Sequence, residues 1–278
     1  MENYINKKFV ISEHIGNGKF GEVYKGKNIR TKEIVAIKLE KENSIFKLLK
    51  RETTILNYLY RKGVKNIPYI YWYGKFNTHS CLVMTHFQEN LLSYVLNIDL
   101  TVSVLFDIFT KCIRLLESIH KNTVIHRDIK PQNFMIKNNE IYLIDYGLAI
   151  FITNNDGELI EKIDYESVVG TPKYISYFNH NGEPQSRRDD LLSLGYIYLY
   201  FKNGNLPWEN TDNIEDSTKY YETSLVHPKN LYRKNLKQFH MLENECDEFI
   251  INYFDYCYTL NWYDDPDYEK LINIFTTT

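Results

Sequence analysis

The sequence has little cysteine: four in 278 residues, at positions 81, 112, 246 and 257, and none of them forms a C-x-x-C pair. Structural zinc sites and small disulfide-stabilised domains need closely paired or numerous cysteines. The composition therefore lacks the pattern of a zinc module or a disulfide-rich secreted domain. We expect reduced thiols, as in the cytosol.

Long apolar runs and an excess of one charge are also missing. The most apolar run is LLSLGYIYLYF at 191–201, well short of the roughly 20 residues that a membrane-spanning helix needs. The opening residues, MENYINKKFVISE, hold no apolar signal-peptide segment. The formal net charge is −3, which offers no basic excess for nucleic acid. We expect no membrane partner, no nucleic-acid partner and a cytoplasmic location, with the nucleus left open.

The first third of the chain carries mostly strand patterns. Residues 9–40 alternate apolar and polar side chains between glycine breaks, which predicts three short antiparallel strands. Residues 67–87 also have strand character, with predicted breaks near Gly74 and around 77–78. Between them, residues 44–61 have helical spacing. The predicted apolar face of this helix comprises Ile45, Leu48, Leu49, Ile55, Leu56 and Leu59.

From about residue 91 the pattern is mainly helical. Helices are predicted over 102–120, 190–202, 246–260 and 267–275, and short strands around 134–136 and 141–144. Run 191–201 falls in the second of these helices, which we expect to be buried. The chain is thus predicted to be α+β, with a small β-rich N-terminal part containing one main helix and a larger helical C-terminal part.

A glycine motif lies in the first predicted strands. GNGKFGEV places Gly16, Gly18 and Gly21 in the spacing G-x-G-x-x-G. This spacing also marks dinucleotide-binding folds, and a plain glycine-rich hairpin would contain it too. In a dinucleotide site the third glycine opens a helix, whereas here Glu22 and Val23 continue the strand pattern. A hairpin whose glycines let backbone amides approach phosphates fits better.

Lys38 and Glu52 are predicted to form a pair. Lys38 ends the strand IVAIK, and Glu52 falls on the apolar face of the helix over 44–61. A carboxylate on a buried face is costly unless a cation pairs with it. The alternative is that both long side chains reach solvent separately. A paired lysine would be oriented toward phosphate oxygens.

A dense polar segment lies between apolar residues at VIHRDIKPQNFMI, 124–136. HRDIKPQN resembles the catalytic loop H-R-D-x-x-x-x-N of protein kinases, and DYG at 145–147 resembles their D-F-G, with Tyr146 for Phe. The resemblance implies the bilobal kinase fold over residues 9–275, with an N-lobe of about 1–86 and a C-lobe of about 87–278. It also implies ATP and Mg²⁺ as cofactors.

The resemblance assigns roles to the residues of these motifs. Asp128 would orient the substrate hydroxyl and accept its proton, and Lys130 would reach the transferred phosphate. Asn133 and Asp145 would hold Mg²⁺. Thr171, in GTPKY, would bridge Asp128 and Lys130. A lysine two residues after the aspartate resembles the serine/threonine kinases.

The same resemblance implies a nucleotide site in the N-terminal part. Lys38 would bind the α- and β-phosphates, Ile15 and Val23 would cover the base, and Met84 would precede a hinge over 85–87. The full set of residues expected to bind the nucleotide is Ile15, Gly16, Asn17, Gly18, Lys19, Phe20, Gly21, Glu22, Val23, Lys38, Glu52, Met84 and Phe87.

The segment after the glycine-threonine-proline motif narrows the likeness to one family. The chain has no A-P-E, and the run QSRRDDLLSLGY at 185–196 closely resembles the casein kinase 1 family. Ser176, Tyr177 and Phe178 stand where that family has S-I-N. The resemblance implies that Asp190 is buried and accepts hydrogen bonds from the catalytic-loop backbone. It extends over about residues 9–275.

The family prefers acidic or pre-phosphorylated protein substrates, which it binds with a basic pocket. Lys173 and Lys219 stand at positions expected to contact anions, but a lysine lacks the bidentate fork of arginine. Between Trp208 and Lys219 the chain reads ENTDNIEDST, with four acids. This loop is either a solvated surface or a sign that the preference for primed substrates is reduced. We expect protein substrates with serine or threonine, and a monomer.

Two other classes share this fold. A pseudokinase would use it as an ATP-binding or scaffolding module, but such proteins usually lack the strand lysine or one of the two aspartates, and all three are present here. A small-molecule kinase would generally lack the Q-S-R-R-D-D segment. The prediction is therefore a serine/threonine protein kinase, with a pseudokinase as the alternative.

Overall fold

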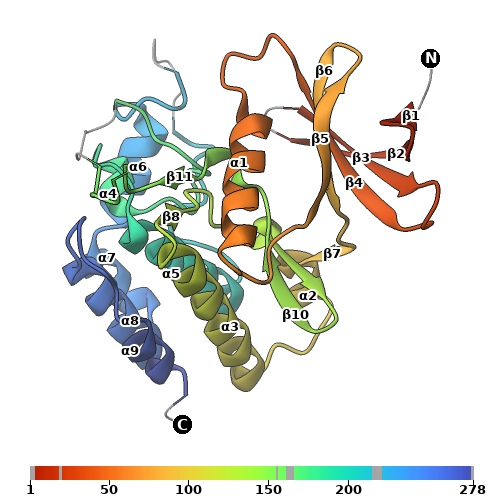
Figure 1. Cartoon of the computed structure of the whole chain (residues 1–278). Coiled ribbons are helices and arrows are strands. Elements are labelled where there is room, and N and C mark those ends of the chain that lie inside the picture. The colour runs from red at the N-terminus through yellow and green to blue at the C-terminus, as the bar shows by residue number, and fades with distance from the viewer. Residues whose placement is uncertain (1–3, 19–20, 155, 161–165, 215–220, 277–278) are drawn as a thin grey trace. The chain divides into compact units, whose positions relative to one another are not determined.

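The computed structural model of the protein describes residues 4–18, 21–154, 156–160, 166–214 and 221–276. The chain forms two compact units, and most of their helices and strands are labelled in Figure 1. The first unit comprises Met1–Asn90 and Phe134–Ala149, and the second comprises Leu91–Asn133 and Ile150–Thr278. The assignment of residues 9–275 to one kinase domain, with lobes divided near residue 86, stays a prediction.

An antiparallel six-stranded sheet dominates the first unit, in the order β1-β2-β3-β4-β6-β5. Its strands are β1 (Tyr4–Ile5), β2 (Phe9–Gly18), β3 (Gly21–Asn28), β4 (Ile34–Lys41), β5 (Ile70–Phe76) and β6 (His79–Thr85). The three strands expected over 9–40 are confirmed as β2, β3 and β4. The expected break at Gly74 is wrong: β5 continues through it, because the missing Cβ leaves room for the ring of Trp72, which a Cβ would approach to 2.5 Å.

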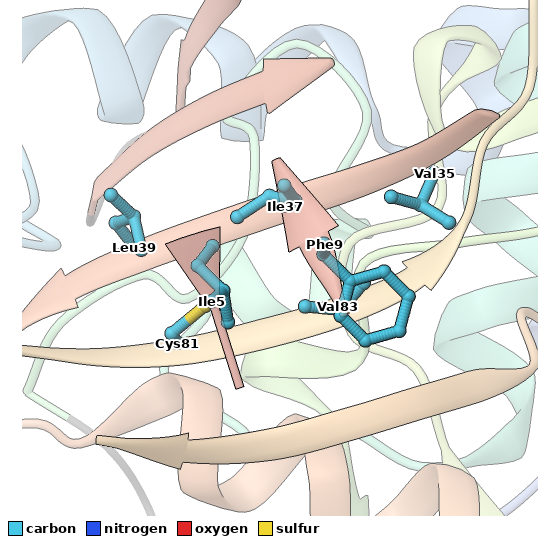
Figure 2. Close-up of a cluster of buried hydrophobic side chains, with 7 residues drawn as sticks. All are labelled: Ile5, Phe9, Val35, Ile37, Leu39, Cys81 and Val83. Carbon is cyan, nitrogen blue, oxygen red and sulfur yellow. The ribbon is translucent and has the colours of Figure 1, made fainter. Parts of the chain in front are cut away.

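The two faces of β4 have different neighbours. Val35, Ile37 and Leu39 point into a buried apolar cluster (Figure 2). The other members of this cluster are Ile5, Phe9, Cys81 and Val83. Since side chains alternate along a strand, Ala36, Lys38 and Glu40 share the opposite face. Ala36 packs there in a second cluster, with Leu49, Leu82 and Met84.

The main helix of the first unit is α1 (Leu48–Arg61), and it contacts β4, β5 and β6. Its buried face includes Glu52 among leucines and isoleucines. The expectation that Ile45 belongs to this face is wrong: Ile45 is 90% exposed and precedes the helix. Lys47 takes a left-handed conformation, with φ of 44°, so the helix cannot extend back through it.

A small sheet and a short helix complete the first unit. β7 (Glu89–Asn90), β9 (Phe134–Lys137) and β10 (Glu140–Leu143) pair in the order β10-β9-β7. The two strands expected around 134–144 are thus confirmed. The 3₁₀ helix η2 (Tyr146–Leu148) follows and packs against α1.

The second unit is mainly helical. The helices are α2 (Leu91–Leu96), α3 (Val102–His120), α4 (Tyr177–His180), α5 (Arg187–Asn203), α6 (Pro228–Leu236), α7 (Phe239–Leu242), α8 (Glu248–Thr259) and α9 (Tyr268–Ile274). Two 3₁₀ helices, η1 (Pro131–Asn133) and η3 (Glu243–Glu245), and the paired strands β8 (Val124–Ile125) and β11 (Ile150–Phe151) lie between them. The four predicted helices are confirmed as α3, α5, α8 and α9, which contact one another. The α+β fold class is confirmed as well.

The helix α5 is the buried centre of this unit. It begins after Ser186, whose N–H donates to the Asp189 carboxylate at 2.7 Å, and ends at Gly204, whose φ of 78° suits glycine. Every residue from 187 to 199 is buried, which confirms the expectation for most of the run at 191–201; Tyr200 and Phe201 at its end are half-buried. Among the helices that the structure describes, none has the length and apolar character to cross a membrane.

Candidate functional site

The glycine motif forms the hairpin between β2 and β3. Gly18 and Gly21 pair in its register, as do Asn17 and Glu22. A Cβ on Gly21 would lie 2.1 Å from the carbonyl oxygen of Leu39, so the close approach of β3 to β4 requires glycine there. Lys19 and Phe20, both expected to contact the nucleotide, lie outside the described residues.

A cluster of three charged side chains lies beside this hairpin in the first unit. Lys38 Nζ donates to both carboxylate oxygens of Glu52, at 2.8 and 3.0 Å, and to Asp145 Oδ1 at 3.0 Å. The predicted pair is therefore confirmed, and Asp145 joins it. Burial alone would lower the pKa of Lys38, but the Asp145 and Glu52 carboxylates raise it above its ordinary value. The lysine is held as a cation.

A second acid on β4 determines where α1 begins. Glu40, 2% exposed, accepts hydrogen bonds from the N–H groups of Leu48 at 2.8 Å and Leu49 at 3.4 Å. Those are the first residues of α1, and the residue before them, Lys47, makes no side-chain cap. A carboxylate at a helix N-terminus satisfies free N–H groups and the positive end of the helix dipole. Strand β4 thus holds α1 twice, through Glu40 at its start and through Lys38 one turn later.

A pocket lies at this cluster, with about 450 Å³ of empty space that includes open solvent. Its lining combines residues of the hairpin, of β4, of α1 and of the 145–147 segment: Gly21, Glu22, Val23, Lys38, Leu39, Leu48, Leu49, Glu52, Asp145 and Gly147. Five of the residues expected to bind the nucleotide are therefore brought together in one pocket.

Four more of the predicted nucleotide residues lie elsewhere in the first unit. Ile15 is 45% exposed on β2, and Gly16 pairs with Val23 across the hairpin. Met84 is buried on β6, and the ring of Phe87 packs 5.0 Å from that of Tyr142. The pocket lining does not include these four.

A second polar cluster is built on the catalytic-loop motif in the second unit. The two oxygens of Asp128 have separate donors: Lys130 Nζ lies 2.7 Å from Oδ2, and Thr171 Oγ1 lies 2.7 Å from Oδ1. Lys130 also donates to Thr171 at 3.3 Å, so the predicted bridge is confirmed. Asn133 Nδ2 donates to the Asp128 carbonyl at 2.8 Å and to Oδ2 at 3.2 Å. These contacts fix the orientation of the Asp128 carboxylate.

Asp190 of α5 holds the backbone of this loop. Its carboxylate accepts from the N–H groups of His126 at 2.7 Å and Arg127 at 2.9 Å, and from His120 Nε2 at 3.0 Å. Burial alone would raise the pKa of Asp190. The hydrogen bonds from His120 and His126 outweigh this effect and hold the pKa below its ordinary value. Arg127 has a φ of 68°, a left-handed conformation that needs such support. The expected role of Asp190 is confirmed.

Lys173, an expected anion contact, already has an anionic partner. Its Nζ lies 2.5 Å from Glu209 Oε1 and 3.8 Å from the centre of the Tyr200 ring. Glu209 is the first acid of the segment after Trp208. The other expected anion contact, Lys219, lies outside the described residues, as do the acids at 215 and 216.

Sequence reasoning missed Glu40 and the contact between Glu209 and Lys173. A signal for Glu40 exists: it lies two residues after Lys38, on the same face of a strand, ahead of a helix without a cap of its own. Glu209 lies in the acidic segment after Trp208, but no sequence pattern paired it with Lys173, because the two residues are 36 positions apart.

The oxygen donors fit a hard cation that binds with a nucleotide. Among the described residues no group of three or more His, Cys, Asp or Glu side chains is placed to hold a metal ion. Mg²⁺ at phosphate-transfer sites needs only one or two carboxylates, because substrate phosphates and water supply the rest. The Asp145 side chain is 46% exposed, and Asn133 uses its Nδ2 on Asp128, which leaves its amide oxygen for a cation. Asp145 and Asn133 thus have the chemistry that Mg²⁺ prefers.

One comparison with known proteins identifies the family. The family model for the protein kinase domain matches residues 9–259, which include the glycine hairpin, the Lys38 cluster and the Asp128 cluster. Proteins of this family are phosphotransferases that generally use ATP and Mg²⁺ and act on proteins. The match covers most of the chain, and this protein belongs to the protein kinase domain family.

Proposed function

We propose that this protein is a serine/threonine kinase of the casein kinase 1 type, which transfers the γ-phosphate of Mg·ATP to serine or threonine hydroxyls of proteins. The observation that carries the proposal is the Asp128 carboxylate, held on one oxygen by Lys130 and on the other by Thr171. A lysine two residues after the aspartate is typical of serine/threonine kinases.

The first unit supplies the residues for the nucleotide. Lys38, kept charged by Glu52 and Asp145, binds the α- and β-phosphates, and Glu52 sets the direction of its side chain. Val23 contributes an apolar wall of the pocket, and Gly21 brings the hairpin close to β4. Mg²⁺ would neutralise charge on the phosphate oxygens; Asp145 of this unit is one proposed ligand, and Asn133, which belongs to the second unit, is the other.

The second unit supplies the residues for the acceptor. Asp128 accepts a hydrogen bond from the substrate hydroxyl, orients it for attack on the γ-phosphorus and takes its proton. Lys130 donates to a γ-phosphate oxygen as charge moves toward the leaving group. Thr171 donates to Oδ1 of Asp128 and so holds the carboxylate in its orientation.

Transfer of labelled γ-phosphate to casein and to a basic protein tests the proposal, with Asp128→Asn beside the wild type. We expect transfer by the wild type and its loss in the variant. Asp107→Asn is the matched control, because Asp107 forms an exposed surface pair with Lys111. Binding of ATP is measured separately. Binding without transfer by the wild type would contradict the proposal and favour a pseudokinase.

We also propose that the preference for acidic or primed substrates is reduced. Glu209 forms an ion pair with Lys173, and its second oxygen accepts from the N–H of Leu206 at 3.3 Å, so the carboxylate is fixed within the chain. A substrate phosphate would have to displace it. Lysine also binds phosphate as a point charge, without the bidentate contact of arginine.

Matched peptides with and without an upstream phosphoserine measure this preference. We expect wild-type kcat/KM values within about three-fold of each other, and a rise of about five-fold for the primed peptide in Glu209→Gln, as expected for a partly exposed ion pair worth about 1 kcal/mol. Asp212→Asn, an exposed acid of the same segment, is the control. A strong wild-type preference for the primed peptide would contradict the proposal.

A further inference from the structure

Lys237 is a lysine inside the second unit that the proposed reaction does not use. It follows α6 directly, and its side chain is 0% exposed. Burial and the nearby Arg233 guanidinium hold its pKa well below the ordinary value. In the described part of the chain no carboxylate forms an ion pair with it. A buried amine of this kind is costly unless its N–H groups have acceptors.

The acceptors of Lys237 are backbone carbonyls. Its Nζ donates to the carbonyl oxygen of Ile175 at 2.6 Å and to that of Pro172 at 3.0 Å. His180 Nε2 lies 3.3 Å away, and the rings of Tyr196 and Trp208 flank the nitrogen at 5.1 and 5.0 Å. An amine has two N–H groups even when it is neutral. The two carbonyls are therefore bonded in either protonation state.

The other end of Lys237 is held as well. The hydroxyl of Tyr258, on α8, donates to the Lys237 carbonyl at 2.5 Å, and the Tyr196 hydroxyl lies 2.9 Å from that of Tyr258. Tyr196 of α5 and Tyr258 of α8 thus fix the backbone of Lys237, while the Lys237 side chain bonds the turn at residues 172–175. Such a double attachment transmits the position of the helical core to that turn.

The turn is part of the Asp128 cluster. Thr171, which donates to Asp128, also accepts from the N–H groups of Tyr174 at 2.8 Å and Ile175 at 3.1 Å through its carbonyl. Pro172, whose own carbonyl Lys237 bonds, is the next residue and offers no N–H. Lys237 therefore bonds the turn at two points, directly after Thr171 and at its far end.

We propose that Lys237 is a positioning residue for the protein substrate. It keeps residues 171–175 in the one arrangement that places the Thr171 hydroxyl on Asp128, and it touches neither substrate nor nucleotide. The proposal rests on the proposed function, because it assigns the second unit to the acceptor. Its effect should therefore fall on the peptide and not on ATP.

Lys237→Met tests this role, because methionine keeps the length and apolar packing but cannot donate to either carbonyl. We expect the KM for a peptide substrate to rise about ten-fold while the KM for ATP stays within two-fold, a split that a uniform loss of folded enzyme would not give. Faster amide hydrogen exchange at residues 174–175 should accompany it. Lys234→Met, in the last turn of α6, is the matched control.

Tyr258→Phe keeps the proposal falsifiable if Lys237→Met does not fold. It removes only the hydroxyl that holds the Lys237 carbonyl, and we expect the peptide KM to rise about three-fold. Equal changes in the two KM values, or unchanged exchange at 174–175, would overturn the proposal. If the wild type transfers no phosphate, the proposed function fails, and exchange at 174–175 still decides whether Lys237 holds the turn.

Discussion

The two units hold their functional side chains with buried groups of opposite chemistry. In the first unit Glu40 accepts hydrogen bonds from the start of α1 and thereby places Glu52. In the second unit the Lys237 amine donates to the carbonyls of the turn that follows Thr171. Backbone N–H groups at a helix start need an acceptor, and the carbonyls of an irregular turn need a donor. The free backbone groups at each place thus determine which kind of side chain can hold it.

Asp190 sharpens this comparison, because it is a carboxylate in the second unit. It bonds the N–H groups of His126 and Arg127 in the catalytic loop. The choice of an acid or an amine therefore follows the local backbone and not the unit. A variant at any of these positions should disturb only the cluster that its backbone contacts support.

The largest expected effect comes from breaking the first cluster at Lys38. Lys38→Met removes the proposed phosphate contact and leaves Glu52 buried without its cation. We expect a loss of transfer by a factor of about 10²–10³, as for other lost electrostatic contacts to a reacting group, and a loss of about 3 kcal/mol in the free energy of unfolding. Steady-state kinetics and denaturant unfolding measure the two effects.

Lys75→Met is the control for this change, since Lys75 pairs with Glu42 at the surface of the same unit. It should alter neither quantity measurably. If Lys38→Met kept more than a tenth of wild-type transfer, the proposed role of the cluster would be wrong.

The next effect concerns Glu40. Glu40→Ala removes the acceptor for the first N–H groups of α1, and we expect a loss of about 1–2 kcal/mol in stability, as for other lost helix caps. Because α1 carries Glu52, the KM for ATP should rise while the peptide KM stays constant. Glu40→Gln keeps one acceptor oxygen, so its stability and its KM for ATP should lie between those of the wild type and of Glu40→Ala.

Glu42→Ala provides the comparison at an exposed position next to the same strand. A Glu40→Ala enzyme with an unchanged ATP KM and only lower stability would show that Glu40 supports the fold without placing Glu52. In Lys237→Met we expect the opposite result, a raised KM for the peptide and an unchanged KM for ATP. The two variants together would show that each unit supports a different substrate.

The smallest expected effect is a pH dependence at Asp189, the neighbour of Asp190. Burial raises the pKa of Asp189 to about 6, although Arg188 and hydrogen bonds from Ser176 and Ser186 act in the opposite direction. Between pH 4 and 6 the folded chain therefore binds a proton there that the unfolded chain does not. By linkage, this group stabilises the fold by about 1 kcal/mol more at pH 5 than at pH 7.

Unfolding of the wild type and Asp189→Asn at the two pH values measures this contribution. The wild type should lose about 1 kcal/mol relative to the variant as the pH rises from 5 to 7. Asp190, whose pKa is lowered, has the opposite sign: its contribution is lost as the pH falls through its folded pKa. A pH-independent difference between wild type and Asp189→Asn would contradict the first expectation.

Much of this could be predicted from the sequence, where a local pattern determines the structure. Alternation over residues 9–40 gave the three strands, and an acid on the apolar face of a helix indicated the Lys38–Glu52 pair. Asp190 could be placed because a family resemblance covers its segment. The start of α1 was predicted near residue 44, because Ile45 continues the apolar spacing. The helix begins only at Leu48, because Lys47 before it has a left-handed conformation.

The contacts of Lys237 had no sequence pattern to reveal them, and Glu40 had only its place on the Lys38 face of a strand, ahead of a helix without a side-chain cap. Glu40 and Lys237 bond backbone groups, which every residue possesses, so no complementary side chain marks the partner. The contact of Lys237 with Ile175 spans 62 positions and exists only once α5, α6 and α8 are packed. Such contacts depend on which backbone groups the fold leaves free, and the fold must be known first.

The glycine hairpin has a consequence for how this sequence can evolve. Every substitution of Gly21 adds a β-carbon, which the Leu39 carbonyl does not admit at 2.1 Å. Gly16 belongs to the same motif, but a β-carbon there would meet no atom of the described residues within 4 Å. As far as steric fit within the chain is concerned, position 16 can accept a side chain and position 21 cannot. We therefore expect substitutions to accumulate at the first glycine of the motif and not at the third.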